Sequence, residues 1–251
     1  MLRIALVVSC LVAVEHRAHA IAACGNGEGW ALASGATVPV HPRLVYYMDG
    51  RRNRGSSSPS ITATIDGKAV TAKISLSSAP PYALAVIEID SDKPGKLVLT
   101  WDGATKANGY FQASEPQMTY AISAKLALPK ETKGTTTRFH RAYHHSTVHE
   151  IDDGLEVSVD VPAVAFTARW RVDSKAAWQT LELTANTTDG HQVARLGSLG
   201  CSVNFDVATL ERGVDLELEA MLPDGKKVKV TGLPAHYALP ALPKNASKSS
   251  P

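Results

Sequence analysis

The alternation of apolar and polar residues is clearest in residues 214–231. Apolar residues occupy every second position from 214 to 222, and acidic residues stand between them at 215, 217 and 219. This period of two is typical of a β-strand that buries one face. A Pro-Asp-Gly turn follows at 223–225, after which valines and lysines alternate. The pattern predicts a β-hairpin whose outward glutamates and lysines pair across the strands. The residues predicted to face inward are Val214, Leu216, Leu218, Ala220, Leu222, Val228 and Val230.

A second hairpin is predicted for residues 61–76. Asp66 and Gly67 form the Asp-Gly signal of a two-residue type I′ turn. The cross-strand pairs that this turn predicts are Ile65 with Lys68, Ala63 with Val70, and Ile61 with Ala72. In this register the inward residues of the second arm are Val70, Ala72, Ile74 and Leu76.

Further short alternating segments predict strands on both sides of residue 130. In the first half they are residues 43–48, 82–89, 96–101, 109–113 and 118–128. In the second half they are residues 157–161, 166–172, 178–185 and 203–207. Strands of this number and spacing are typical of immunoglobulin-like sandwiches. We therefore expect an all-β fold, with two tandem immunoglobulin-like β-sandwich domains after a signal peptide.

Composition sets the expected domain boundaries. Residues 130–137 are polar and lack apolar periodicity, which is typical of a linker. We expect the first sandwich at residues 21–129 and the second at residues 138–233. Residues 234–251 are rich in proline, serine, lysine and alanine, which predicts a disordered tail.

The first twenty residues have the anatomy of an export signal. A positive Arg3 precedes an apolar stretch that is too short to span a bilayer, and Ala18-His19-Ala20 matches a cleavage site. We expect a mature chain that begins at Ile21, contains no transmembrane segment and resides in the periplasm or outside the cell. A lipoprotein anchored at Cys24 is the alternative.

Cleavage would leave two cysteines, Cys24 and Cys201. Export to an oxidising compartment favours a disulfide between them. Two free thiols, or a lipidated Cys24, are the alternatives.

Charge and aromatic content narrow the function classes. The net charge is +2, and no dense stripe of lysine and arginine concentrates it, which argues against a nucleic-acid partner. Aromatic residues make up only 6% of the 251 residues, so the chain offers little material for stacking platforms.

One histidine-rich segment is the candidate site. Four of the nine histidines lie within ten residues of each other: His140, His144, His145 and His149. Neutral imidazole is a good ligand for copper and zinc. In a single extended strand, residues 140 and 144 would share one face and residues 145 and 149 the other. The alternative is an ordinary polar loop, because the spacing matches no HExxH pattern.

Motifs of common hydrolases and nucleotide-binding enzymes are missing from the sequence. It has no G-x-S-x-G, no S-x-x-K and no P-loop. We therefore expect a non-enzymatic protein, while a hydrolase with an unrecognised site remains a third hypothesis.

Two segments carry a family resemblance. Residues 35–44, Gly-Ala-Thr-Val-Pro-Val-His-Pro-Arg-Leu, resemble the first-strand signature of exported bacterial Ig-like domains, including the periplasmic copper-resistance carrier family. Residues 196–225 resemble tandem Ig-like exported proteins of unassigned function. The turn after residue 48 and the N-terminus depart from the copper carriers, so no copper ligand is carried over.

The all-β pattern, the export signal and the lack of catalytic motifs lead us to expect a binding or structural role with an unknown protein or envelope partner. Binding of copper or zinc by the four histidines is the alternative function.

Overall fold

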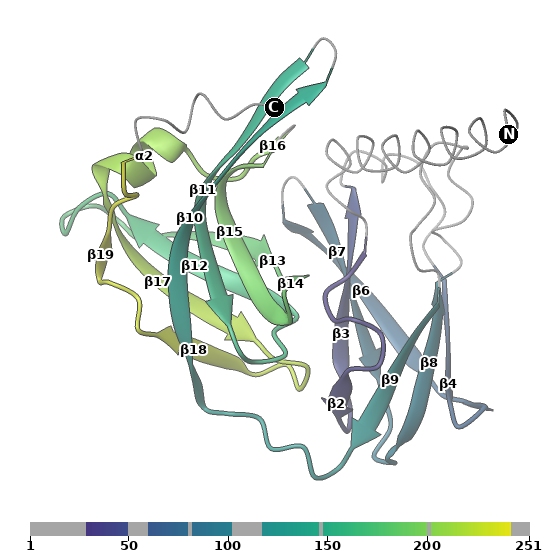
Figure 1. Ribbon diagram of the computed structural model, residues 1–251. Coiled ribbons are helices and arrows are strands. Elements are labelled where there is room, and N and C mark those ends of the chain that lie inside the picture. Colours follow the sequence, from purple (N-terminus) through teal and green to yellow (C-terminus); the bar gives the residue numbers. More distant parts are fainter. Residues whose placement is uncertain are drawn as a thin grey trace, which may run out of the picture.

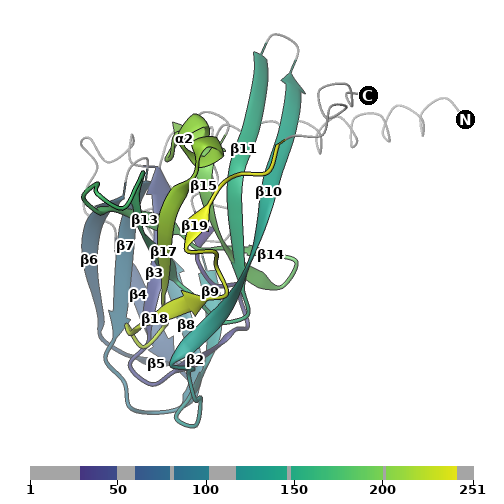
Figure 2. The same cartoon turned by 90° about the vertical axis from the view of Figure 1, so that its left-hand side faces the viewer.

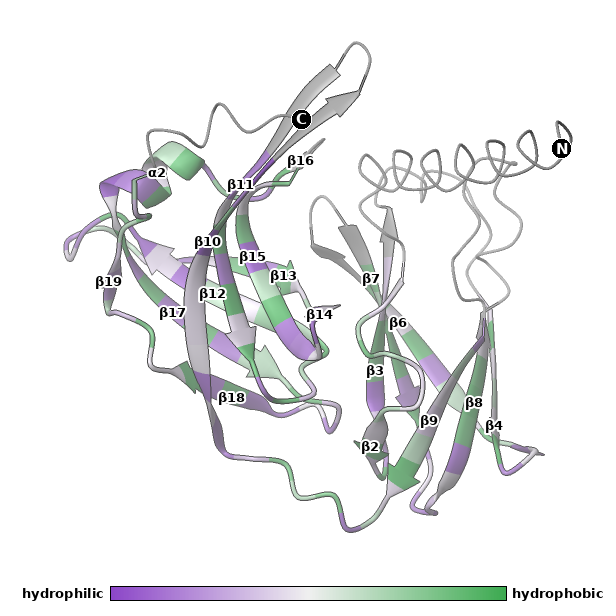
Figure 3. Ribbon diagram, in the orientation of Figure 1, coloured by the Kyte–Doolittle hydropathy of each residue, from purple (hydrophilic) through white to green (hydrophobic). Residues whose placement is uncertain are grey.

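The computed structural model describes residues 29–49, 60–79, 82–101, 117–145, 148–199 and 202–241. Within these ranges, the backbone alone is described for residues 48–49, 77–79, 82–83, 101, 142–145, 148–151 and 202. These residues form three β-sheets and one short helix (Figure 1). The prediction of an all-β chain is confirmed at this level. Figure 3 shows hydrophobic and hydrophilic residues intermingled along single strands, as expected where one face is buried.

The first half of the chain contains two sheets. One has the order β1-β3-β7-β6, and the other has the order β2-β9-β8-β4-β5. The strands of the first sheet are β1 (Gly29–Trp30), β3 (Arg43–Asp49), β6 (Ala72–Ala79) and β7 (Tyr82–Ile89). Those of the second are β2 (Thr37–Pro39), β4 (Ile61–Ile65), β5 (Lys68–Ala69), β8 (Gly95–Trp101) and β9 (Gln117–Ser123).

Trp30 links these two sheets through its ring. Its centroid lies 5.2 Å from that of Tyr46 in β3 and 6.4 Å from that of Tyr120 in β9, both in edge-to-face geometry. The Tyr120 hydroxyl donates to the Leu32 carbonyl at 3.2 Å. The aromatic contacts therefore fill the space between the sheets of the first half.

The second half forms one ten-stranded sheet that curls into a half-barrel (Figure 1). Its main order is β13-β12-β17-β18-β10-β11-β15-β14, with β16 beside β15 and β19 beside β17. The strands are β10 (Glu131–His145), β11 (Val148–Val159), β12 (Ala165–Arg171), β13 (Gln179–Thr184), β14 (Asn186–Thr188), β15 (His191–Leu199), β16 (Ser202–Val203), β17 (Val214–Met221), β18 (Lys227–Thr231) and β19 (His236–Tyr237). β13 and β14 are the two end strands of this order, and only Ala185 separates them along the chain. The two ends of the sheet therefore meet at Ala185.

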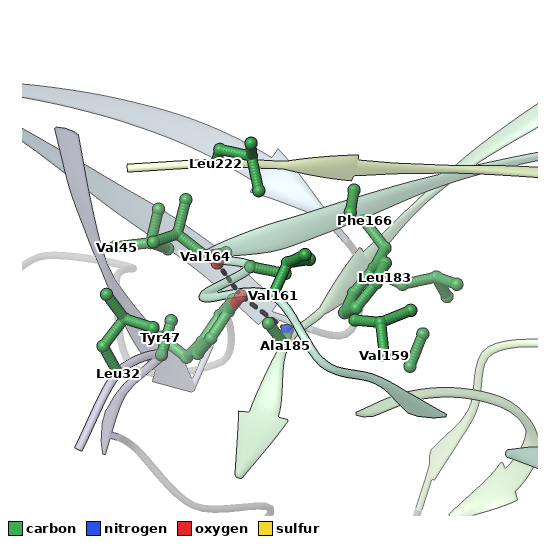
Figure 4. Packing of buried hydrophobic residues seen from close by; sticks show 14 of the residues in the cluster. Leu32, Val45, Tyr47, Val159, Val161, Val164, Phe166, Leu183, Ala185 and Leu222 are labelled. Carbon is green, nitrogen blue, oxygen red and sulfur yellow. Dashed lines mark hydrogen bonds between the residues drawn. The ribbon is translucent and has the colours of Figure 1, made fainter. Parts of the chain in front are cut away.

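Tyr47 of β3 joins the first half to the place where the two ends of this sheet meet, called the seam below. Its hydroxyl donates to the Val164 carbonyl at 2.5 Å and accepts from the Ala185 amide at 2.7 Å (Figure 4). The side chain is buried among apolar residues from both halves, and burial raises the pKa of Tyr47 above its ordinary value. The Gln192 amide, oriented with its nitrogen toward two carbonyls, adds bonds to Ala31 and Ala163 at 3.2 and 3.3 Å. One apolar core thus continues from the first half into the second.

The hairpin predicted at residues 214–231 is confirmed. All seven residues predicted to face inward are buried. Glu219 and Lys229 are Cα partners, as predicted for the outward charges. The other acidic residues of β17 pair on its second side: Glu217 with Arg169 at 3.0 Å, and Asp215 with Arg171 at 2.8 Å.

The hairpin predicted at residues 61–76 is only partly correct. Asp66 and Gly67 have positive φ, 48° and 78°, as a type I′ turn requires, and Ile65 pairs with Lys68. The Val70 amide still donates to the Ala63 carbonyl at 3.0 Å. Ala72, however, pairs with Ile89 in the opposite sheet, so its predicted pairing with Ile61 is wrong. The predicted inward face holds for Val70, Ala72 and Ile74, which pack against the core, and fails at Leu76, which is 54% exposed.

Three other expectations need correction. Residues 131–137, predicted to be linker, form the first half of β10, which leaves residues 124–130 as the connection between β9 and β10. Residues 236–237, predicted to be disordered, form β19, and Leu239 beyond them is buried. Of the strand predicted at residues 203–207, only Val203 is in a strand, and helix α2 (Val207–Arg212) begins at its end. The strand predicted at residues 109–113 lies outside the described residues.

The paired charges on the outer face predict an acid-sensitive stability. A hydrogen bond from His236, and next one from Arg171, lowers the pKa of Asp215 from 3.8. A carboxyl whose pKa is lower when folded stabilises the protein at neutral pH, and this stabilisation is lost as the pH falls below about 4. We expect Asp215→Asn to lose less stability than the wild type between pH 6 and pH 3. Urea midpoints at the two pH values measure this. Asp92→Asn, at an exposed aspartate, is the control and should follow the wild type.

Candidate functional site at the β10–β11 ribbon

Two long strands extend beyond the half-barrel as a two-stranded ribbon. β10 pairs with β18 only over residues 131–133, and β11 pairs with β15 only over residues 153–159. Beyond these points, residues 140–145 and 148–152 pair only with each other within the described part of the chain. These residues are called the ribbon below. Figures 1 and 2 show it projecting past the other strands of its sheet.

A buried arginine anchors the base of the ribbon. The Arg138 side chain is 7% exposed and binds Asp153 with two bonds, Nε to Oδ1 at 2.8 Å and Nη2 to Oδ2 at 2.6 Å. It also donates to Glu211 at 2.9 Å and to the Pro240 carbonyl at 2.6 Å. This arrangement, called the Arg138 cluster, ties β10 to β11, helix α2 and the C-terminal segment.

The Arg138 guanidinium is stabilised in its charged form by two carboxylates. The hydrogen bond to Asp153 is the main cause that raises the pKa of Arg138, and the bond to Glu211 adds to it. Because a nearly buried cation is stable only when it is paired, these carboxylates keep the guanidinium in place. The cluster therefore acts as a structural anchor.

Helix α2 holds Glu211 in position. The Asp206 side chain caps the first turn by accepting from the amides of Ala208 and Thr209. The Thr209 hydroxyl bond is the main cause that lowers the pKa of Asp206. The helix ends at Gly213, whose φ of 97° breaks the helical geometry.

His140 lies beside this cluster. Its Nδ1 is buried, lies 3.6 Å from Asp153 Oδ2, and has no hydrogen-bond partner among the described residues. A distance of 3.6 Å is too long for a hydrogen bond. His140 is therefore at the base of the ribbon, within reach of Asp153 after a small shift.

The strand register separates the other three predicted ligands. His144 is the Cα partner of His149, and His145 is the Cα partner of Val148. Directly opposite residues of an antiparallel pair share a face, so residues 144 and 149 belong to one face and residue 145 to the other. Residues 145 and 149 therefore do not share a face, as they would in a single extended strand, because they lie on two antiparallel strands. The side chains of these three residues lie outside the described set.

Metal and disulfide predictions stay predictions. Among the side chains that the structure describes, no three from histidine, cysteine, aspartate and glutamate gather into a metal-binding group. Cys24 and Cys201 lie outside the described residues, as does the expected signal peptide, residues 1–20. In the described segments, no helix has the length and apolar character needed to cross a bilayer.

The Arg138 cluster was missed by sequence reasoning. Asp153 and Glu211 stand 15 and 73 residues from Arg138 along the chain. A hint existed in the β10 segment, where two arginines and three histidines face a segment of β11 that contains three acidic residues. Only the register of the hairpin turns that hint into contacts.

Comparison with known proteins gives no family. No protein-family model matches the chain, and no curated protein does. A structure of the type I pullulanase of Bacillus subtilis with maltose aligns at 10% identity and a TM-score of 0.24, covering 81% of this chain and 24% of that one. A pullulanase from Anoxybacillus with maltotriose aligns at 10% identity and a TM-score of 0.23, covering 81% and 29%. The chain thus spans less than a third of these pullulanases, and at such TM-scores the matches carry no argument.

Proposed function

We propose that this chain is a non-enzymatic, exported binding protein, with an immunoglobulin-like β-sandwich in its first half and the half-barrel in its second half, acting in the periplasm or at the cell surface through the ribbon. One observation carries the proposal. The ribbon extends from the half-barrel and, within the described residues, no other strand pairs with it. The export signal and the lack of catalytic motifs in the sequence support the compartment and the non-enzymatic role.

A projecting two-stranded ribbon adds little stability to a fold and exposes unpaired backbone groups, so its presence points to a binding role. An isolated hairpin is marginally stable in water, and unpaired strand edges invite association. Open edges are also the surface on which a partner strand adds to a sheet by main-chain hydrogen bonds. The envelope partner proposed here would therefore bind an edge of the ribbon as an additional strand.

The body of the protein is suited to presenting such an element. The Arg138 cluster fixes the base of the ribbon to three other segments. Tyr47 joins the first unit to the seam of the second. A ribbon held on a rigid base loses less conformational freedom on binding than a free loop would.

Site-specific photo-crosslinking tests this function. A photoreactive amino acid at position 143 or 150, which are Cα partners in the ribbon, should give discrete adducts with an envelope protein. The same amino acid at exposed position 175, in the β12–β13 connection, is the matched control and should give none. Adducts of equal yield at all three positions, or none at any, would reject binding through the ribbon.

Metal binding by the histidines is the second candidate function. The observation that favours it is the register, which places His144 opposite His149. Imidazole nitrogens bind copper and zinc, and an exported protein meets both ions without competing cytosolic thiols. Metal analysis of the purified protein after incubation with copper or zinc and dialysis tests this function. Retention of less than a tenth of an equivalent would reject it.

A further inference from the structure

We infer that His144 and His149 form a two-histidine site for a divalent transition metal, with copper(II) bound more tightly than zinc. The juxtaposition that carries the inference is their pairing as Cα partners near the end of the ribbon. The site rests on the second candidate function and narrows it from four histidines to two.

The geometry of a β-ladder favours this pair. Directly opposite residues have Cβ atoms about 4.5–5.5 Å apart. Metal–imidazole bonds of about 2.0–2.1 Å let a single ion bridge two such residues. The register therefore places two histidines directly opposite each other without any change in backbone pairing.

The same ladder excludes the other two histidines from this ion. His145 is paired with Val148 and belongs to the opposite face. His140 precedes His144 by four residues on one strand, which corresponds to about 13 Å at 3.3 Å per residue. It is also placed beside Asp153 at the base of the ribbon. One ion cannot bridge that distance.

Two ligands leave the coordination sphere incomplete. Copper and zinc take four or more ligands, so two or more positions would be filled by water or by a donor from another molecule. The preference for copper over zinc follows the general order of stability for nitrogen ligands. The ion would crosslink the two strands near the end of the ribbon, where no other strand of the described segments pairs with them.

Calorimetric titration of the purified protein with copper(II) tests the site. His144→Ala and His149→Ala should each weaken the first binding step at least tenfold. His145→Ala, on the opposite face of the same ribbon, is the matched control and should change it less than threefold. Electron paramagnetic resonance of the wild-type copper complex should show two equivalent nitrogen ligands, and each of the two variants should show one.

The outcomes separate the site from the function on which it rests. If the wild type binds no copper and no zinc at micromolar concentrations, metal binding itself fails. If the wild type binds metal and His145→Ala weakens it as much as His144→Ala does, metal binding stands and the assignment to this pair is overturned.

Discussion

Replacing Tyr47 with phenylalanine is expected to lower the free energy of unfolding by about 2–4 kcal/mol. The hydroxyl serves two backbone groups at once, the Val164 carbonyl and the Ala185 amide. Each buried polar group left without a partner costs about 1–3 kcal/mol. The phenyl ring keeps the apolar contacts, so the variant isolates the hydrogen bonds. Urea denaturation measures the change.

Tyr120→Phe is the matched control for Tyr47→Phe. It removes a hydroxyl that donates to the Leu32 carbonyl at 3.2 Å, within the first half of the chain. Its expected cost is about 1 kcal/mol. Equal effects of the two substitutions would contradict the special role of Tyr47 at the joint between the units.

Replacing Arg138 with methionine is also expected to lower the free energy of unfolding strongly. It removes the cation that pairs with Asp153, whose side chain is 13% exposed, and leaves that carboxylate nearly buried and unpaired. Breaking a buried pair in this way costs about 3–5 kcal/mol. We expect a loss of that size by urea denaturation, together with faster proteolytic cleavage within the ribbon.

Two further variants serve as the control and the rescue for Arg138→Met. Arg169→Met removes an arginine whose partner Glu217 is half exposed, and an exposed pair of this kind is worth about 0–1 kcal/mol. The double variant Arg138→Met/Asp153→Leu replaces the pair with apolar groups and should recover most of the loss. A loss for Arg169→Met as large as that for Arg138→Met would contradict the assignment of Arg138 as the anchor.

Strand positions were predictable where one face is plainly apolar. The alternation at residues 214–231 predicted both strands and the pairing of outward glutamates with lysines, of which Glu219 and Lys229 are an example. Sheet membership was not predictable at residues 72–79, because the same alternation suits either sheet of a pair. The Asp189-Gly190 turn carries the same signal as Asp66-Gly67, with φ of 50° and 83°, and it would have revealed the β14–β15 hairpin.

The start of β10 shows why composition was misleading. Its inward residues there are Thr132 and Gly134, which are small or polar and give no hydrophobic period. Space requires this choice, because a Cβ on residue 134 would lie 2.6 Å from Val230 Cγ1. A strand that packs against bulky neighbours can therefore look like a linker in sequence.

The sequence predicted which residues belong to the candidate site but not how they are arranged. The histidines were identified from sequence, but which of them face each other depends on the register of β10 and β11. The residues between these strands, Ser146 and Thr147, carry no glycine, asparagine or proline signal that would have predicted it. The buried anchor depends on residues from β10, β11 and α2, and sequence separation hides such contacts.

Amide hydrogen exchange along β10 and β11 tests most directly whether the ribbon stands free of the sheet and is available to bind. We predict that amides of residues 141–151 exchange at least a hundredfold faster than those of residues 155–159, which lie in the same strand but pair with β15 as well. Equal protection along the whole of β11 would contradict the account, since it would mean that the ribbon is already supported.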